Sequence, residues 1–295
     1  MQRLFARRQP PLTAFEVRAV TSADRAALTR LTERSRRAHF HLDWWSLDDW
    51  LNQSRADGCL VARHRNQLAG VIVAPPQDTP ITWVRLFAVA DDYAAEAVFS
   101  ALLPPVLAAL RAVNVQALAC LAHPDWLARL LPGAGFAPRV EVANFVKESR
   151  DIPDYGWAGA EVRPAALDDL SAVLPNDRAA FDPVWWHTLD SLQRALRDMA
   201  HFVVAEVDGR SVGHAFSDLY GRQGHLVRLA VHPDVQGRGI GTRLLAESLE
   251  YLIAKCSAWP LTLNTQTDNY TSQSLYRRFG FAPTGDSTMV MIRET

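Results

Sequence analysis

Three glycines stand close together between an apolar run and a helical pattern, in the stretch "VRLAVHPDVQGRGIGTRLL" from Val227 to Leu245. Glycine is costly in backbone entropy, so Gly237, Gly239 and Gly241 indicate a need for bare backbone. The first amides of a helix have no internal partners and carry partial positive charge. A strand, a glycine loop and a helix start in this order are therefore suited to holding a phosphate group, and Arg238 could add a charge-assisted contact.

Two common phosphate-binding motifs do not fit this loop. A P-loop requires Gly-Lys-Ser/Thr, whereas Thr242 and Arg243 follow Gly241. A dinucleotide fingerprint requires a further glycine where Thr242 or Leu244 stands. For such a loop taken alone, a tight strand-to-helix turn that binds nothing remains an alternative.

A second stretch, "NYTSQSLYRRFGF" from Asn269 to Phe281, places Asn269, Ser272 and Tyr276 on one helix face by their spacing of i, i+3 and i+7. A surface helix with a tyrosine at its rim is the alternative. The run "V-x-P-x-x-Q-x-x-G-x-G", followed by "N-x-x-[AS]-x-x-L-Y-x-x-x-GF", resembles the two signatures of the GNAT superfamily of N-acetyltransferases.

The resemblance implies acetyl-CoA as co-substrate, with the loop amides on its pyrophosphate and the end of the preceding strand on its pantetheine arm. The implied binding residues are Leu229, Ala230, Val231, Gln236, Gly237, Arg238, Gly239, Ile240, Gly241, Thr242, Asn269, Ser272 and Tyr276.

Tyr276 matches the position of the family's general acid, and a phenol with a pKa near 10 is protonated at neutral pH. Amides at the end of the 226–231 strand could stabilise the tetrahedral oxyanion of acetyl transfer. The general base stays open. His214, Asp218 and His225 lie on strands that should flank the site, although a structural or solvated role is favoured for each.

The elements that must position these residues occur twice. "VRLFAV" at Val84 recurs as "VRLAV" at Val227, and "GFAP" and "EVR" also recur. "WWSLDDWL" at Trp44 has a looser echo in "WWHTLDSL" at Trp185, and all four pairs are 141 to 145 positions apart. We therefore predict an α/β fold with two tandem GNAT domains, each a mixed sheet with helices, spanning 1–149 and 150–295. The join is expected in "SRDIPDYGWAGAEVR".

Within the second domain, apolar periodicity and turn residues predict the individual elements. Strands are expected at 160–165, 224–231, 261–266 and 288–294, a hairpin at 201–220 around Asp208-Gly209, and helices at 167–174, 183–199, 242–255 and 270–279.

The first domain keeps the repeated motifs such as "VRLFAV" and "GFAP". It lacks both the glycine loop and the tyrosine motif. Its counterpart of the glycine loop is "ADDYAAEA", where Asp91, Asp92 and Glu96 would repel a pyrophosphate, and no tyrosine matches Tyr276. We expect a degenerate domain that is structural or forms part of the acceptor site. Its tryptophans Trp44, Trp45 and Trp50 could line an acceptor cleft, although packing in the core is favoured.

The expected function is transfer of an acetyl group from acetyl-CoA to a primary amine of a small-molecule or peptide acceptor. The alternative is a non-catalytic module that senses acyl-CoA.

A net charge of −1 does not favour nucleic acid or a membrane surface as partner. Three scattered cysteines predict neither a metal site nor disulfides. No secretory signal and no apolar run of membrane-spanning length is evident, so a cytoplasmic location is expected. Acceptor, acyl-chain preference and oligomeric state (monomer or homodimer) stay open.

Overall fold

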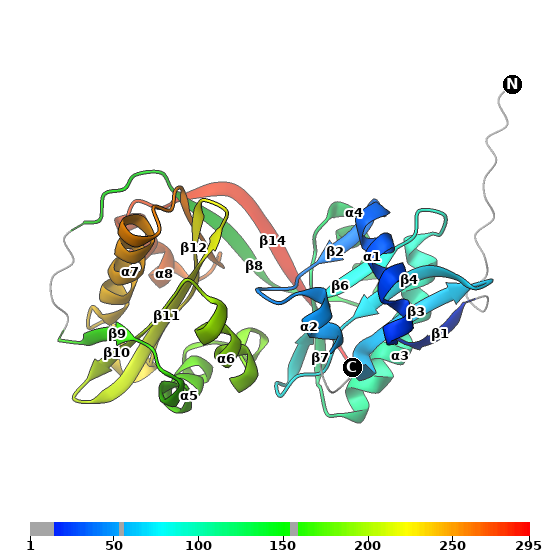
Figure 1. Ribbon diagram of the computed structural model, residues 1–295, viewed down its shortest axis with the longest axis horizontal. Helices are drawn as coiled ribbons and strands as arrows, with labels where there is room; N and C mark the ends of the chain where they lie inside the picture. Colours follow the sequence, from blue (N-terminus) through cyan, green and yellow to red (C-terminus); the bar gives the residue numbers. More distant parts are fainter. Residues whose placement is uncertain (1–14, 53–55, 154–158) are drawn as a thin grey trace, which may run out of the picture. The chain divides into compact units, whose positions relative to one another are not determined.

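A computed structural model of the chain describes residues 15–52, 56–153 and 159–295 (Figure 1). The basic N-terminal stretch before Phe15 and residues 154–158 of the predicted join lie outside the described residues. The chain forms two compact units: unit 1 holds the chain up to Arg139 together with Met289–Thr295, and unit 2 holds Val140–Thr288. Each is a mixed α/β unit, which confirms the predicted fold class.

Unit 1 is built on an antiparallel sheet of strand order β1-β3-β4-β6-β2, and β5 pairs in parallel with β7. Its elements are β1 Glu16–Ala19, α1 Arg25–Arg34, β2 Arg37–Phe40, α2 Leu47–Leu51, β3 Cys59–His64, β4 Gln67–Val73, β5 Ile81–Trp83, β6 Leu86–Val89, α3 Ala95–Ala112, β7 Ala117–Leu121 and α4 Asp125–Leu130.

Unit 2 contains the elements predicted for the second domain except the last strand. They are β9 Glu161–Pro164, α5 Leu170–Ala180, α6 Leu189–Asp198, β10 His201–Val207, β11 Arg210–Tyr220, β12 Gln223–Val231, α7 Ile240–Glu250, β13 Leu261–Gln266 and α8 Tyr270–Arg278. The hairpin turns at Asp208 and Gly209, both with positive φ, as predicted. The predicted helix at 183–199 was too long, because Thr188 caps α6 and the residues before it form only a short 3-10 turn.

The last strand of each half of the chain pairs outside its own half. Strand β8 (Ala137–Lys147) pairs antiparallel with β13 in unit 2, from Val142 opposite Gln266 to Lys147 opposite Leu261. The end of β14 (Ala282–Glu294) pairs antiparallel with β7 in unit 1, where Val290 lies opposite Leu121. The strand predicted at 288–294 is therefore present, but its partner is a strand of the first half.

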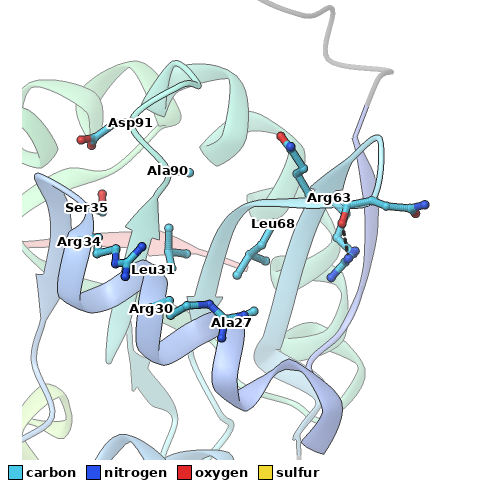
Figure 2. A pocket seen from close by; sticks show the side chains of 11 residues that line it. Ala27, Arg30, Leu31, Arg34, Ser35, Arg63, Leu68, Ala90 and Asp91 are labelled. Atoms are coloured by element: carbon cyan, nitrogen blue, oxygen red, sulfur yellow. Dashed lines mark hydrogen bonds between the residues drawn. The ribbon is translucent and has the colours of Figure 1, made fainter.

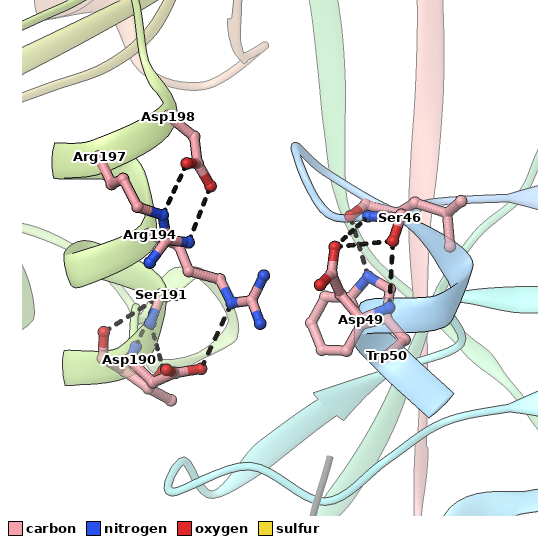
Figure 3. A network of polar contacts seen from close by, with 10 residues as sticks. Ser46, Asp49, Trp50, Asp190, Ser191, Arg194, Arg197 and Asp198 are labelled. Carbon is pink, nitrogen blue, oxygen red and sulfur yellow. Dashed lines mark hydrogen bonds and ion pairs between the residues drawn. The ribbon is translucent and has the colours of Figure 1, made fainter. Parts of the chain in front are cut away.

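The repeats in the sequence recur as matched contacts in the two units. Ser46 caps α2 within a capping box with Asp49 (Figure 3). Thr188 caps α6 within a capping box in the same way. The "EVR" repeat gives a second match. Arg18 binds Asp24 through two hydrogen bonds of 2.7 Å, and Arg163 binds Asp169 through bonds of 2.7 and 2.8 Å. The repeated sequence motifs therefore form the same local structure in both units.

Each unit has its own apolar core. In unit 1, Trp45 and Trp50 are buried with their rings stacked 4.3 Å apart, so they pack in the core as favoured from the sequence. Helix α3, at 18 residues, is long and apolar enough by composition to cross a membrane, contrary to the expectation that no run reaches that length. Its apolar residues, including Phe99 and Leu102, pack in the core of unit 1.

We expect Asp24→Asn to lower the free energy of unfolding at pH 7 by about 2 kcal/mol, because it breaks the bidentate contact with Arg18. The hydrogen bonds from Arg18 lower the pKa of Asp24 against the effect of its burial. The stability that the carboxylate contributes is present above its unfolded pKa of about 3.9 and is lost as pH falls through the lower folded value.

Urea unfolding of both proteins between pH 7 and pH 3 measures this effect, and the difference should shrink in the acid range. Asp48→Asn is the control, because Asp48 forms only an exposed pair with Arg25 and should cost less than about 1 kcal/mol. Equal losses from both variants would contradict the prediction.

Candidate functional site

Two neighbouring strands of unit 2 diverge part of the way along their length. Strands β12 and β13 pair in parallel only from Gly224 opposite Leu261 to Leu226 opposite Leu263. The next residue, Val227, is extra in the register with β11, because Ser217 lies opposite Leu226 and Phe216 opposite Arg228. A bulge of this kind bends the strand and ends local pairing. Beyond it, no β13 residue pairs with residues 228–231 of β12.

The divergence leaves backbone groups of β12 unpaired on one edge. The His232 amide donates to the Val212 carbonyl on the β11 side. Backbone groups alternate along a strand, so those of Leu229 and Val231 point to the other side. The Gln236 side chain donates to the Val231 carbonyl at 3.0 Å. The amides of Leu229 and Val231 therefore face the open edge, and Gln236 ties the following loop to the strand end.

The glycine loop and α7 follow directly. Gly237 and Gly239 have φ of +76° and +85°, which only glycine adopts without strain, and Gly239 is the N-cap of α7. Gly241 differs, because it lies in the first helical turn and a Cβ there would lie 3.7 Å from Leu229 and Val231, an ordinary contact. Among the described residues, no steric contact requires a glycine at position 241.

Helix α8 carries the second predicted motif. The Asn269 side chain caps the helix by accepting from the Ser272 amide at 3.1 Å. Tyr276 is buried at 6% exposure. Burial raises the pKa of Tyr276 to about 12, opposed by a hydrogen bond with the Ser272 side chain and by the charge of Arg228. The phenol is therefore fully protonated at neutral pH.

A cavity of about 540 Å³ lies where these elements meet. Of the predicted site residues, it is lined by Leu229, Ala230, Val231, Gln236, Gly237, Gly239, Ile240, Gly241, Thr242, Asn269 and Ser272. Arg238 is exposed and does not line it, and neither does Tyr276, although Ser272 links the phenol to the cavity wall.

The cavity also contains residues that the sequence did not single out. Arg278 donates to the Thr242 hydroxyl at 2.5 Å, which places a cation beside the start of α7. Phe181, just after α5, forms another part of the wall. Arg278 lies within the second predicted motif, two residues after Tyr276, so its position on the helix was the available signal. Phe181 is brought there by tertiary packing alone.

The three residues considered as a general base do not line the cavity. His214 is fully buried beside Asp177 at 3.3 Å, and burial lowers its pKa. His225 hydrogen-bonds Thr262 at 2.9 Å, and burial lowers its pKa to about 4. Asp218 lies opposite His225 in the β11–β12 register, away from the open end of β12. The base stays unassigned.

In unit 1, the edge that corresponds to the open edge of β12 is occupied by another strand of the same unit. Strand β5 pairs with β7 and is interrupted at residues 84 and 85, before β6. Strand β2 then pairs with β6, with Arg37 opposite Val89 and His39 opposite Phe87. The turn from β6 to α3 contains no glycine and no residue of positive φ. The connection therefore forms without glycines, and the edge that is open in unit 2 is closed in unit 1.

Unit 1 also has a cavity of about 490 Å³, but elsewhere in the fold. It lies between α1 and the β3–β4 turn and is lined by Arg30, Arg34 and Arg63, with Asp91 at another side (Figure 2). It contains no counterpart of the glycine loop. Among the described residues of both units, no group of three or more His, Cys, Asp or Glu side chains could hold a metal ion.

The sequence of unit 2 and the fold of the chain are similar to those of known acetyltransferases. The model of the Acetyltransferase (GNAT) family matches residues 170–281. A putative [ribosomal protein bS18]-alanine N-acetyltransferase of Bacillus subtilis is 29% identical over 128 residues, which cover 43% of this chain and 83% of that protein.

Two solved structures share the fold over nearly the whole chain. A GCN5-related N-acetyltransferase from Sphaerobacter thermophilus is 18% identical with a TM-score of 0.64, and 97% of each chain is covered. A tandem GNAT protein from the clavulanic acid biosynthesis pathway is 14% identical with a TM-score of 0.62, covering 95% of this chain and 98% of that one.

A mixed sheet with diverging strands and a glycine loop thus defines an acyltransferase-type fold in unit 2. Residues 170–281 match the GNAT acetyltransferase family, as the sequence motifs predicted, and the chain shares its two-unit fold with a tandem GNAT protein.

Proposed function

We propose that this chain is an acetyl-CoA-dependent N-acetyltransferase with one working site, in unit 2. The observation that carries the proposal is the unpaired edge of β12 beside Gly241, a glycine that no steric contact among the described residues requires. In unit 1, strand β2 pairs with the corresponding edge of β6. An edge of this kind can therefore bind an extended chain.

The residues present fit acetyl-CoA. The free amides of Leu229 and Val231 suit the amide groups of a pantetheine arm, which would pair with β12 as β2 pairs with β6. The first turn of α7 suits a pyrophosphate, because its amides are unpaired and Gly241 leaves them accessible. Arg278 adds positive charge at the same end of the cavity, and Arg238 lies within the loop.

In the proposed reaction, the acceptor amine forms a C–N bond with the acetyl carbon while the C–S bond breaks. The strand-end amides stabilise negative charge on the acetyl oxygen. Tyr276 gives its hydroxyl proton to the leaving sulfur, and water returns a proton to the phenolate. The amine loses a proton to solvent or to a base that is not assigned. The link from Tyr276 to the cavity is the hydrogen bond with Ser272.

The acceptor is proposed to be a primary amine of a small molecule or a peptide. The Bacillus subtilis relative is named for acetylation of an alanine in a ribosomal protein. A peptide with an N-terminal alanine therefore belongs in any acceptor panel beside small amines.

A non-catalytic acyl-CoA sensor is the second candidate. The burial of Tyr276 at 6% exposure, outside the cavity lining, is the observation that favours it. A sensor would bind acetyl-CoA but would not release CoA with any amine.

We expect one acetyl-CoA to bind per chain, because β2 closes the equivalent edge in unit 1. Isothermal titration calorimetry of the full chain gives the stoichiometry directly. Two equivalents would show that unit 1 also binds the ligand and would contradict the assignment of a single site.

We expect Gly241→Ala to weaken acetyl-CoA binding at least about tenfold, because a methyl group would stand between the ligand and the amides. Alanine is the better helix former by about 0.5–1 kcal/mol, and its Cβ meets only ordinary contacts, so thermal stability should not fall. Gly133→Ala in unit 1, where a Cβ meets nothing within 4 Å, is the control for binding. Unchanged affinity in Gly241→Ala would argue against the pyrophosphate site.

We expect Tyr276→Phe to lower kcat by about 10²- to 10⁴-fold without weakening acetyl-CoA binding, since only the proton donor is removed. The measurement is CoA release with a panel of amines and peptides. Tyr270→Phe, on the same helix at 75% exposure, should leave the rate unchanged. Release of CoA by the wild type with no acceptor at all would identify hydrolysis, and no release with any acceptor would favour the sensor.

A further inference from the structure

The cavity of unit 1 is lined by an excess of positive charge. Arg30 and Arg34 lie four positions apart on α1, so they share one face of that helix, and Arg63 lies near the end of β3 (Figure 2). Among the described residues that line the cavity, Asp91 carries the only carboxylate. The charges of the three guanidinium groups therefore exceed that of the carboxylate.

The two arginines of α1 are available to a ligand. Both are exposed, and neither forms a hydrogen bond or an ion pair within the part of the chain that the structure describes. The Asp91 carboxylate is engaged by Arg36 instead, since it accepts from the Arg36 amide at 3.1 Å and lies 3.9 Å from Arg36 Nε. Guanidinium groups left in this state can bind phosphate oxygens through two parallel hydrogen bonds.

Arg63 is only loosely held by its carboxylate neighbour. Its Nη1 lies 3.6 Å from Asp24, beyond hydrogen-bond distance, and Arg18 already binds both oxygens of Asp24 at 2.7 Å. Its Nη2 donates to the Asn66 carbonyl, which fixes the arginine to the β3–β4 turn. The Arg63 side chain is 23% exposed, so it adds a partly desolvated positive charge to the cavity wall.

The corresponding positions of α5 in unit 2 carry no charge. At the spacing that relates the two "EVR" motifs, Arg30 corresponds to Pro175 and Arg34 to Ala179. A helix therefore forms at this place in the fold without either arginine. Helix packing does not account for the two guanidinium groups of α1.

The third position has the opposite charge in unit 2. Arg63 corresponds to Glu206, because Arg63 lies opposite Glu16 of β1 and Glu206 lies opposite Glu161 of β9. Arg163 binds Glu206 there. Two carboxylates thus share one arginine in unit 2, whereas two arginines share one carboxylate in unit 1. The positive cavity is a property of unit 1 and not of the shared fold.

The rest of the cavity wall suits an organic group. Leu31, Leu68 and Ala27 line it beside the arginines. The volume of about 490 Å³ lies in the range of small-molecule sites, and a phosphate group alone would fill only part of it. A phosphate monoester carries nearly two negative charges at pH 7, because its second pKa is about 6. Its charge therefore matches that of the cavity.

We propose that this cavity is a second ligand site of the chain, which binds a phosphate monoester with an apolar organic group. Arg30 and Arg34 bind the phosphate oxygens, Arg63 adds to the positive charge, and Leu31 and Leu68 contact the organic group. The inference does not rest on acetyl transfer, since all residues that line the cavity belong to unit 1.

The test is isothermal titration calorimetry of the full chain with phenyl phosphate and, separately, with inorganic phosphate. Arg30→Gln with Arg34→Gln removes both unpaired guanidinium groups. Because both side chains are exposed, this variant should keep the melting temperature of the wild type. We expect phenyl phosphate to bind the wild type and to bind this double variant about tenfold or more weakly.

The matched control is Arg25→Gln with Arg111→Gln, which removes the same charge from unit 1 at two residues that do not line the cavity. It should change the affinity for phenyl phosphate less than about threefold, since exposed charges at a distance are screened. Equal weakening in the two double variants would show a general effect of charge and would overturn the proposal.

Three further results decide the assignment. Absence of binding to the wild type, or equal binding to the wild type and the Arg30→Gln, Arg34→Gln variant, would overturn the site, because the second result places the probe elsewhere, such as at the start of α7. Inorganic phosphate should bind more weakly than phenyl phosphate, and equal affinities would overturn the assignment to a monoester. The acetyl-CoA affinity should be the same in all three proteins, so a failure of the proposed function appears in a separate titration.

Discussion

The end of parallel pairing between β12 and β13 is the constraint on which the rest of unit 2 depends. Because Val227 is extra in the register with β11, β12 turns away from β13 after Leu226 and keeps an unpaired edge. Buried backbone groups require partners, so an edge beside a cavity is stable only if water, side chains or a ligand satisfy it. Gln236 satisfies the Val231 carbonyl, and the free amides remain for a ligand. The glycine loop, the start of α7 and the face of α8 are all placed around that edge.

Unit 1 shows a different solution to the same constraint. In unit 1 the chain is interrupted between β5 and β6, at residues 84 and 85. Strand β2 then pairs with β6 and supplies the hydrogen bonds of that edge from within the chain. Once the edge is filled, no ligand needs to reach the start of α3, and acidic residues such as Asp91 and Glu96 carry no penalty there. The absence of glycines from this turn is therefore compatible with an edge that β2 occupies. Both support the proposal of a single site, in unit 2.

The sequence predicted the local conformation of the candidate site better than the arrangement of the sheets. Gly237 and Gly239 need positive φ and Asn269 is a helix cap, and such local requirements are visible in residue type and spacing. Periodicity shows that residues 288–294 form a strand, but a strand pattern is the same whichever sheet receives it. The pairing of β14 with β7, the role of β2 and the contact of Asp177 with Arg228, 51 positions apart, arise from tertiary packing. No local pattern encodes them.

The exchange of strands gives the degenerate half a structural role that does not depend on any ligand. Strand β8 carries Phe145 into the core of unit 2, at 1% exposure, and β14 carries Met291 into the core of unit 1. Burial of a large apolar side chain contributes about 1.5–3 kcal/mol, and each strand also completes a ladder of backbone hydrogen bonds. A chain cut between residues 149 and 150 would separate β14 from β7 and β8 from β13. Each half therefore completes the other's sheet, so the first half supports the proposed site even though its own edge is closed.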